Sequence, residues 1–225
     1  MATLVPALLG ALRERMGFSW IARQGCAIHS NSELEGPKRR CKFNSPDVAR
    51  QYRDHAVAEL RVQLRAGDVV AICGLADLHF SRLTLAYYSE VLMPLIRARG
   101  ATLLLVGSIP LLKASDAALC RPTPANPEAA VNCEIPYESA KRPWDYRDIT
   151  ERWARADAFA MTWNDTAYHL KLFDLFCAPH EGTCGAVVPG TAIPAYDDKI
   201  HLSHAGSLYL APFLCASLNN WGLLG

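Results

Sequence analysis

The sequence lacks any apolar run of about 18 residues or more, so it has no segment typical of a membrane-spanning helix. It also lacks an excess of charge of either sign. Its 23 basic and 22 acidic side chains are scattered, which argues against a nucleic-acid-binding surface. The apolar residues 1–12 have no basic stretch before them and continue into Arg13, Glu14 and Arg15. We therefore predict an amphipathic helix here and not a signal peptide.

Several motifs are missing as well. There is no G-x-G-x-x-G turn, no P-loop, no G-x-S-x-G elbow and no tandem C-x-x-C spacing. These absences argue against common dinucleotide, nucleotide and zinc sites, and against the usual α/β-hydrolase elbow. What is present is a chain of 225 residues, 51% hydrophobic, which is enough to bury the core of one domain with insertions.

Six of the eight cysteines form close pairs in polar, loop-like segments. The pairs are Cys26 with Cys41, Cys120 with Cys133, and Cys177 with Cys184. Local pairs of this kind predict disulfides and an oxidising compartment. A zinc site formed by Cys177, His180 and Cys184 is the alternative. Cys73 and Cys215 lie in apolar runs, and we predict that they are buried free thiols.

Helical patterns and short apolar runs alternate along the chain. The predicted helices cover 3–16, 46–66, 84–99, 145–156 and 166–176, with a last helix after Ser203. The predicted strands cover 18–23, 68–73, 101–106 and 158–163, and residues 108–144 form a Pro-rich, disulfide-tied insertion. This alternation predicts an α/β fold of three layers, a mainly parallel sheet with helices on both faces.

The stretch with the clearest chemical potential is Asp198-Lys-Ile-His201, directly before the last apolar helix. Ser203 is placed to cap that helix. A carboxylate three residues before a histidine can orient the imidazole and stabilise its protonated form, as the base of a hydrolase triad requires. The plainer interpretation is a polar surface loop.

The closing block D-x-x-H-L-S-x-x-G, Asp198 to Gly206, is similar to the last motif of SGNH-type hydrolases. The strand Asp68-Val-Val-Ala-Ile and the segment Leu-Leu-Val-Gly-Ser-Ile-Pro110 fit the same pattern, as do the cysteine loops. More narrowly, the chain resembles the SGNH domain attached to acyltransferase-3-type membrane O-acyltransferases. The resemblance covers nearly all of residues 1–225 as one domain and implies a flavodoxin-like sheet.

The resemblance assigns roles to only a few residues. His201 matches the base and Asp198 its orienting partner. The family nucleophile is a serine in a Gly-Asp-Ser-His block after the first strand, and residues 1–8 resemble the continuation of that block. We therefore expect the first strand and the serine to lie outside this chain. Gly74 and Gly25 match possible oxyanion-hole glycines, although Ala76 stands where many members have an Asn.

The resemblance implies acyl-ester transfer or hydrolysis, with an acyl donor and a carbohydrate-type hydroxyl as partners. It implies no metal, no other cofactor and no nucleic acid, an extracytoplasmic or lumenal location, and a membrane acyltransferase domain in the same gene. Because the serine is expected elsewhere, this chain alone should be inactive. The alternative hypothesis is a catalytically inactive, disulfide-stabilised domain that binds glycans or another ligand.

Overall fold

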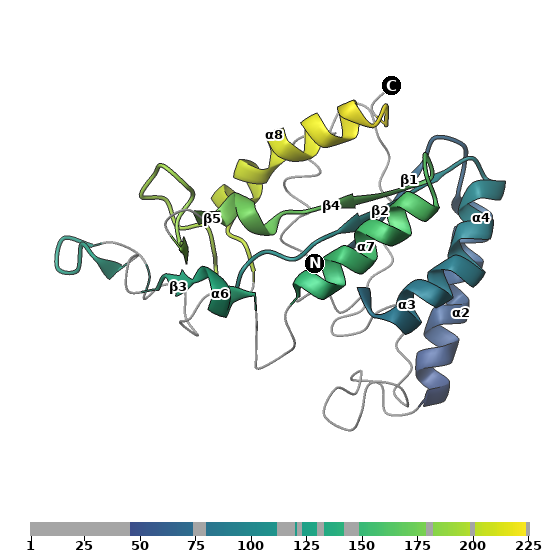
Figure 1. Ribbon diagram of the computed structural model, residues 1–225, viewed down its shortest axis with the longest axis horizontal. Helices are drawn as coiled ribbons and strands as arrows, with labels where there is room; N and C mark the ends of the chain where they lie inside the picture. Colours follow the sequence, from purple (N-terminus) through teal and green to yellow (C-terminus); the bar gives the residue numbers. More distant parts are fainter. Residues whose placement is uncertain are drawn as a thin grey trace.

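A three-stranded parallel sheet forms the centre of the structure (Figure 1). The computed structural model describes residues 46–73, 80–111, 120, 123–129, 133–141, 149–178, 182–198 and 201–223. The strands are β1 Val69–Cys73, β2 Thr102–Val106 and β4 Ala167–Leu170, in the order β1-β2-β4. The predicted strands at 68–73 and 101–106 are thus confirmed to within one residue. The helix and strand predicted at 3–16 and 18–23 lie outside the described residues.

Helices cover both faces of this sheet. Alternate side chains of β2 point to opposite faces, as in any strand. Leu103 and Leu105 belong to one core cluster, which includes residues of α4 and of α7 Thr150–Thr162. Leu104 and Val106 belong to a second cluster, which includes the buried stripe of α8 His204–Asn220. The predicted three-layer α/β fold is therefore confirmed.

The helix predicted at 84–99 is present as three consecutive segments. They are α3 Arg82–Tyr87, the π-helical turn η2 Tyr88–Leu92 and α4 Met93–Ala98. The helix begins two residues earlier than predicted because the Ser81 hydroxyl accepts a hydrogen bond from the Thr84 N–H at 3.2 Å. In the described part of the chain, no helix has both the length and the apolar character needed to cross a membrane.

The predicted boundaries are also wrong at the end of the first described helix. α2 covers Pro46–Gln63 and ends three residues before the predicted position. Gly67 follows with a φ of +84°, a conformation that glycine adopts without steric cost. This turn leads directly into β1.

The prediction of a strand at 158–163 is wrong, because these residues continue α7. Trp153, Ala156 and Phe159 are buried at a spacing of three residues, so the apolar run extends a helical stripe. The helix predicted at 145–156 therefore begins later and ends later than expected.

The prediction of a helix at 166–176 is also wrong. This stretch forms the strand β4 and then the 3₁₀ turn η5 Phe173–Phe176. Asp165, with a φ of +62°, lies in the turn between α7 and β4. Leu103 pairs with Ala167 and Val106 with Leu170, so pairing with β2 fixes this short segment as a strand.

A second, small sheet involves the predicted insertion. β3 Ile135–Pro136 pairs with β6 Thr183–Cys184, which also pairs with β5 Cys177–Ala178. The short helix α6 Tyr137–Ala140 follows β3. The insertion is thus joined to the cysteine loop that follows η5.

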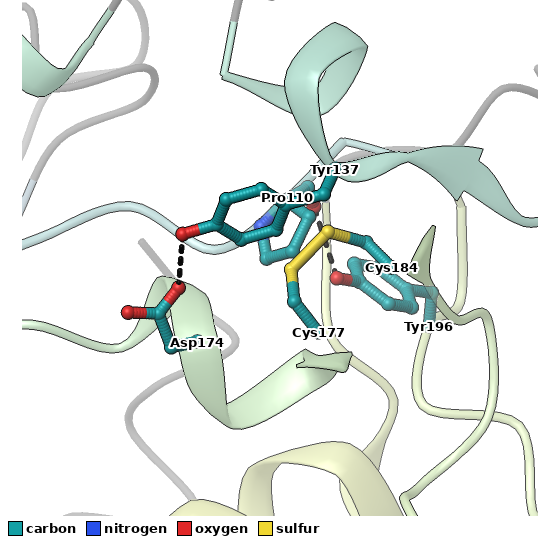
Figure 2. The surroundings of a disulfide bond; sticks show 6 residues. All are labelled: Pro110, Tyr137, Asp174, Cys177, Cys184 and Tyr196. Carbon is teal, nitrogen blue, oxygen red and sulfur yellow. Dashed lines mark hydrogen bonds between the residues drawn. A yellow bond between two sulfur atoms is a disulfide. The ribbon is translucent and has the colours of Figure 1, made fainter. Parts of the chain in front are cut away.

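Two of the three predicted disulfides are present, Cys120–Cys133 and Cys177–Cys184. Cys26 and Cys41 lie outside the described residues. Figure 2 shows Cys177–Cys184 beside two hydrogen bonds, one from the Tyr137 hydroxyl to Asp174 and one from the Tyr196 hydroxyl to the Pro110 carbonyl, each 2.9 Å long.

Cys73 and Cys215 form no disulfide, as predicted, but both are half-buried and not buried. Cys73 ends β1, which is less covered than β2. Ala71 is exposed and Val70 is half-buried, whereas all five residues of β2 are buried. Among the described strands β1 is an edge of the sheet, and this position explains its lower burial.

The disulfides should contribute measurably to stability. Cys120→Ser/Cys133→Ser should lower the free energy of unfolding by about 3 kcal/mol, and Cys177→Ser/Cys184→Ser by about 2.5 kcal/mol, because the unfolded chain regains loop entropy. The sequence separations are 13 and 7 residues. Urea unfolding measures both values. Cys215→Ser is the control, and disulfide variants as stable as the wild type would contradict the prediction.

Candidate active site

A narrow loop presents the two residues of the D-x-x-H motif. The backbone N–H of Asp197 donates to the His201 carbonyl at 2.9 Å, and that of Ser203 donates to the Ala195 carbonyl at 2.9 Å. Tyr196 and Leu202 form an isolated antiparallel bridge between these two bonds. These contacts join the two arms of the loop and place Asp198 and His201 at its tip.

Asp198 and His201 form the predicted pair. Oδ2 of Asp198 lies 2.6 Å from Nδ1 of His201, and Oδ1 accepts a hydrogen bond from the His201 backbone N–H at 2.8 Å. Both oxygens of the carboxylate therefore hold the same residue. When Nδ1 carries the proton, it donates to Asp198, and Nε2 is left with its lone pair as a proton acceptor.

The pair is accessible. The His201 side chain is 38% exposed and that of Asp198 46%. No hydrogen bond among the described residues engages Nε2 of His201. The arrangement can accept a proton at Nε2 and stabilise the resulting imidazolium, which is the chemistry of a general base.

A buried hydrogen bond ties this loop to the central sheet. The Tyr196 hydroxyl donates to the carbonyl of Pro110, four residues beyond the end of β2 (Figure 2). The Tyr196 ring is fully buried and contacts Phe176 with a centroid distance of 5.8 Å. The loop thus lies at the side of the sheet where the parallel strands end, which is where sites form in open α/β folds.

The last helix begins as predicted. Ser203 caps α8 by accepting a hydrogen bond from the Gly206 N–H at 3.0 Å, and its hydroxyl donates to the Pro194 carbonyl at 2.7 Å. His204 is the first residue of the helix and is exposed. The hydroxyl of Ser203 therefore serves the fold, although it lies two residues from His201.

The other predicted site residues, Gly74 and Gly25, and the possible zinc ligand His180 lie outside the described residues. The zinc alternative is wrong, because the disulfide between Cys177 and Cys184 removes the two thiolates that it requires.

A second Asp–His pair, which was not predicted from the sequence, lies between α7 and β4. Nδ1 of His169 lies 2.9 Å from Oδ1 of Asp157, and Nζ of Lys171 lies 2.6 Å from Oδ2 of the same carboxylate. Burial opposes the charge of Asp157, but the hydrogen bonds from Lys171 and His169 outweigh it and lower its pKa. A separation of 12 residues does not indicate a contact between Asp157 and His169. The wrong prediction of a helix at 166–176 obscured this contact further.

His169 is too buried to act on a substrate. Its side chain is 1% exposed, and its Nε2 has no hydrogen-bond partner among the described residues. A Cβ on Gly107 would lie 3.5 Å from this nitrogen. Burial lowers the pKa of His169, and the hydrogen bond with Asp157 opposes that effect only in part. We interpret this pair as a structural contact between β4 and α7.

The close packing of Gly206 should make it irreplaceable. A Cβ there would lie 2.1 Å from the carbonyl oxygen of Ala195. We expect Gly206→Ala to lower the free energy of unfolding by at least about 2 kcal/mol, because α8 and the loop must separate. In Gly185→Ala, the control, the new Cβ meets no atom within 4 Å. Urea unfolding compares the two, and equal losses would contradict this reading of the contact.

The buried His169 should make stability depend on pH. Because burial lowers its pKa in the folded state, the unfolded chain binds more protons just below the ordinary value of about 6.5. The contribution of neutral His169 to the free energy of unfolding is complete above about pH 6.5. It is lost as the pH falls toward the lower pKa of the folded state. His169→Asn keeps a donor toward Asp157 but does not titrate, so the plot of unfolding free energy against pH should be shallower just below about pH 6.5. An unaltered slope in His169→Asn would refute the assignment.

The fold and the Asp198–His201 geometry agree with one comparison with known proteins. A family model described as "SGNH domain (fused to AT3 domains)" matches residues 1–214, which is nearly the whole chain. No curated protein and no solved structure matches the chain significantly. The matched family is the one whose closing motif the segment Asp198–Gly206 resembles. We conclude that this chain belongs to the SGNH domains that are fused to AT3, or acyltransferase-3-type, domains.

Proposed function

We propose that this domain takes part in acyl-ester transfer or hydrolysis, with His201 as the base and Asp198 as its orienting group. The observation that carries the proposal is the pair itself. The 2.6 Å contact fixes Nδ1, while the side chain of His201 stays 38% exposed. Membership of the SGNH family supports a hydrolase or acyltransferase type of chemistry.

In this mechanism Nε2 of His201 removes the proton from a serine hydroxyl as the oxygen attacks the acyl carbon of the donor. The imidazolium, stabilised by Asp198, then gives the proton to the leaving group, and an acyl-serine remains. His201 next deprotonates an acceptor hydroxyl or a water, which attacks the acyl-serine. The serine oxygen recovers the proton, and the cycle closes. The pair alone supplies every proton transfer, so the residues of the mechanism require no cofactor.

We place the nucleophilic serine outside these 225 residues. Among the described residues, no serine hydroxyl bonds to His201. Ser203 is committed to capping, and Ser108 and Ser207 are buried. The strand β1, an edge among the described strands, supports the same proposal, because its half-buried residues Val69 and Val70 would be better covered if a further strand lay beside it.

The substrate class and the location follow from the family and the disulfides. Fusion to AT3 domains supports a membrane acyltransferase domain as partner. We propose that the acyl group passes to a carbohydrate-type hydroxyl. Cys120–Cys133 and Cys177–Cys184 support an extracytoplasmic or lumenal location, because disulfides persist in oxidising compartments. We further propose that residues 1–225 form a single domain.

The test begins with the transcript upstream of residue 1, which should encode an apolar strand and Gly-Asp-Ser-His in frame. The polypeptide translated from that complete frame is then assayed for hydrolysis of p-nitrophenyl acetate. His201→Ala should reduce kcat/KM by about 10²–10⁴-fold, and Asp198→Asn should reduce it substantially. His204→Ala, three residues away and exposed, should retain wild-type activity. Undiminished activity in His201→Ala would refute the proposed role.

A second candidate function is a binding domain without turnover. It is favoured by one observation, namely that no hydrogen bond joins a described serine to His201. If unrelated sequence or a stop codon precedes residue 1, this candidate becomes the better one. Titration of the chain with acetylated and unacetylated oligosaccharides would then show binding, and no acetate would be released.

A further inference from the structure

The last helix differs in charge from the other long helices of the structure. α8 has 17 residues and contains no Asp, Glu, Lys or Arg. α2 contains six such residues, and α7 contains four. A surface helix normally has charged side chains on the side that faces water. α8 lies along the outside of the sheet, and yet it lacks them (Figure 1).

Between Leu208 and Ala216 the outer face of α8 is apolar and accessible. The inner face is the buried stripe Leu210, Leu214 and Leu218. On the opposite side Leu208 is 44% exposed and Phe213 39%, and the Phe213 ring contacts Tyr209 at 5.3 Å. Pro212 and Ala216 lie between them and are also exposed. We call these five residues, 208, 209, 212, 213 and 216, the α8 face.

Four other large apolar side chains are exposed among the described residues, namely Leu83 on α3, Ile193, Val62 and Met161. Val62 on α2 is 82% exposed, and Met161 on α7 is 74% exposed. Both belong to helices with many charges, and single exposed apolar residues are common on protein surfaces. They are therefore suitable controls for the α8 face.

The α8 face lies next to the candidate active site. α8 begins three residues after His201, and Ser203 and Gly206 fix its first turn against the loop. Leu208 follows one turn later. A partner that covers the α8 face would therefore bind the helix whose first turn is fixed to the loop of His201.

The size and chemistry of the face discriminate between partners. A helix of 17 residues is about 25 Å long and about 10 Å wide, so its face offers on the order of 250 Å². This is well below the roughly 800 Å² per partner that a stable complex of free molecules buries, so a second copy of this chain would bind poorly. The face also has no Lys or Arg to attract anionic lipid headgroups. A partner in the same polypeptide is different, because tethering supplies a high effective concentration and makes a small apolar contact sufficient.

We propose that the α8 face is the docking surface for the AT3 membrane domain to which SGNH domains of this family are fused. This inference rests on the proposed function, which supplies both the AT3 domain as partner and the role of His201 as the base. Docking there holds the Asp198–His201 pair against the domain that handles the acyl group, so the acyl group reaches the active site without release into water.

Photo-crosslinking in membranes tests the docking surface directly. The chain is produced together with the AT3 domain encoded in the same reading frame, and a frame without such a domain would overturn the proposal, because the small face depends on tethering. The photoreactive residue p-benzoylphenylalanine replaces Leu208 or Phe213, and in controls Met161 or Val62. We expect adducts with AT3 peptides from positions 208 and 213 and none from the control positions. Adducts with lipid, a second copy or residues 1–45 instead, equal adducts from the controls, or no AT3 adduct at all would overturn the proposal.

A functional arm separates this inference from the proposed function. Leu208→Glu/Phe213→Glu should reduce acyl transfer to the natural acceptor by at least tenfold while hydrolysis of p-nitrophenyl acetate is retained, and Met161→Glu should leave both unchanged. If the double variant keeps both acyl transfer and ester hydrolysis, the docking proposal is overturned. If His201→Ala retains activity while the AT3 adducts form, the proposed mechanism fails and the docking surface stands.

Discussion

The placement of the candidate site depends on the segment Ala195-Tyr196, which is held between the central sheet and the last helix. On one side, the Tyr196 hydroxyl bonds to Pro110 just beyond β2. On the other, the Ala195 carbonyl lies against Gly206 so closely that no side chain fits there. The loop that presents Asp198 and His201 begins at this segment, so the position of the pair follows from the packing of two backbone regions far apart in the sequence. The turn η5, which leads into the small sheet, supports this arrangement. Its Phe176 ring packs against the Tyr196 ring, and its Asp174 accepts a hydrogen bond from the Tyr137 hydroxyl.

Local features were predictable from the sequence, and contacts between distant segments were not. The Asp198–His201 pair and the Ser203 cap depend on residues three apart, so their spacing contains the information. The strands β1 and β2 are apolar runs of strand length after a glycine turn, which is a strong local signal. In contrast, the two-residue strands β3, β5 and β6 have no periodicity of their own and form only because the chain pairs them.

The errors between α7 and η5 have the same cause. The run from Ala158 to Trp163 is apolar enough for a buried strand, and only the burial of Trp153, Ala156 and Phe159 on one side reveals the helical period. The strand β4 is short, and it is a strand because β2 offers a free edge to Ala167–Leu170. With the helix and the strand of this region predicted at the wrong positions, the pair His169–Asp157 could not be foreseen, because it joins a strand to a helix.

The two Asp–His pairs show that surroundings, and not residue types, decide what such a pair can do. In both, a carboxylate oxygen lies within hydrogen-bond distance of Nδ1 of the imidazole. Asp157 shares its second oxygen with Lys171, and His169 is 1% exposed, so the pair is balanced by a cation and closed to substrate. Asp198 uses its second oxygen to fix the backbone of His201 itself, and the side chain of His201 is 38% exposed. Only a pair of this second kind can exchange a proton with an external group, and it lies at the start of the helix whose outer face lacks charge.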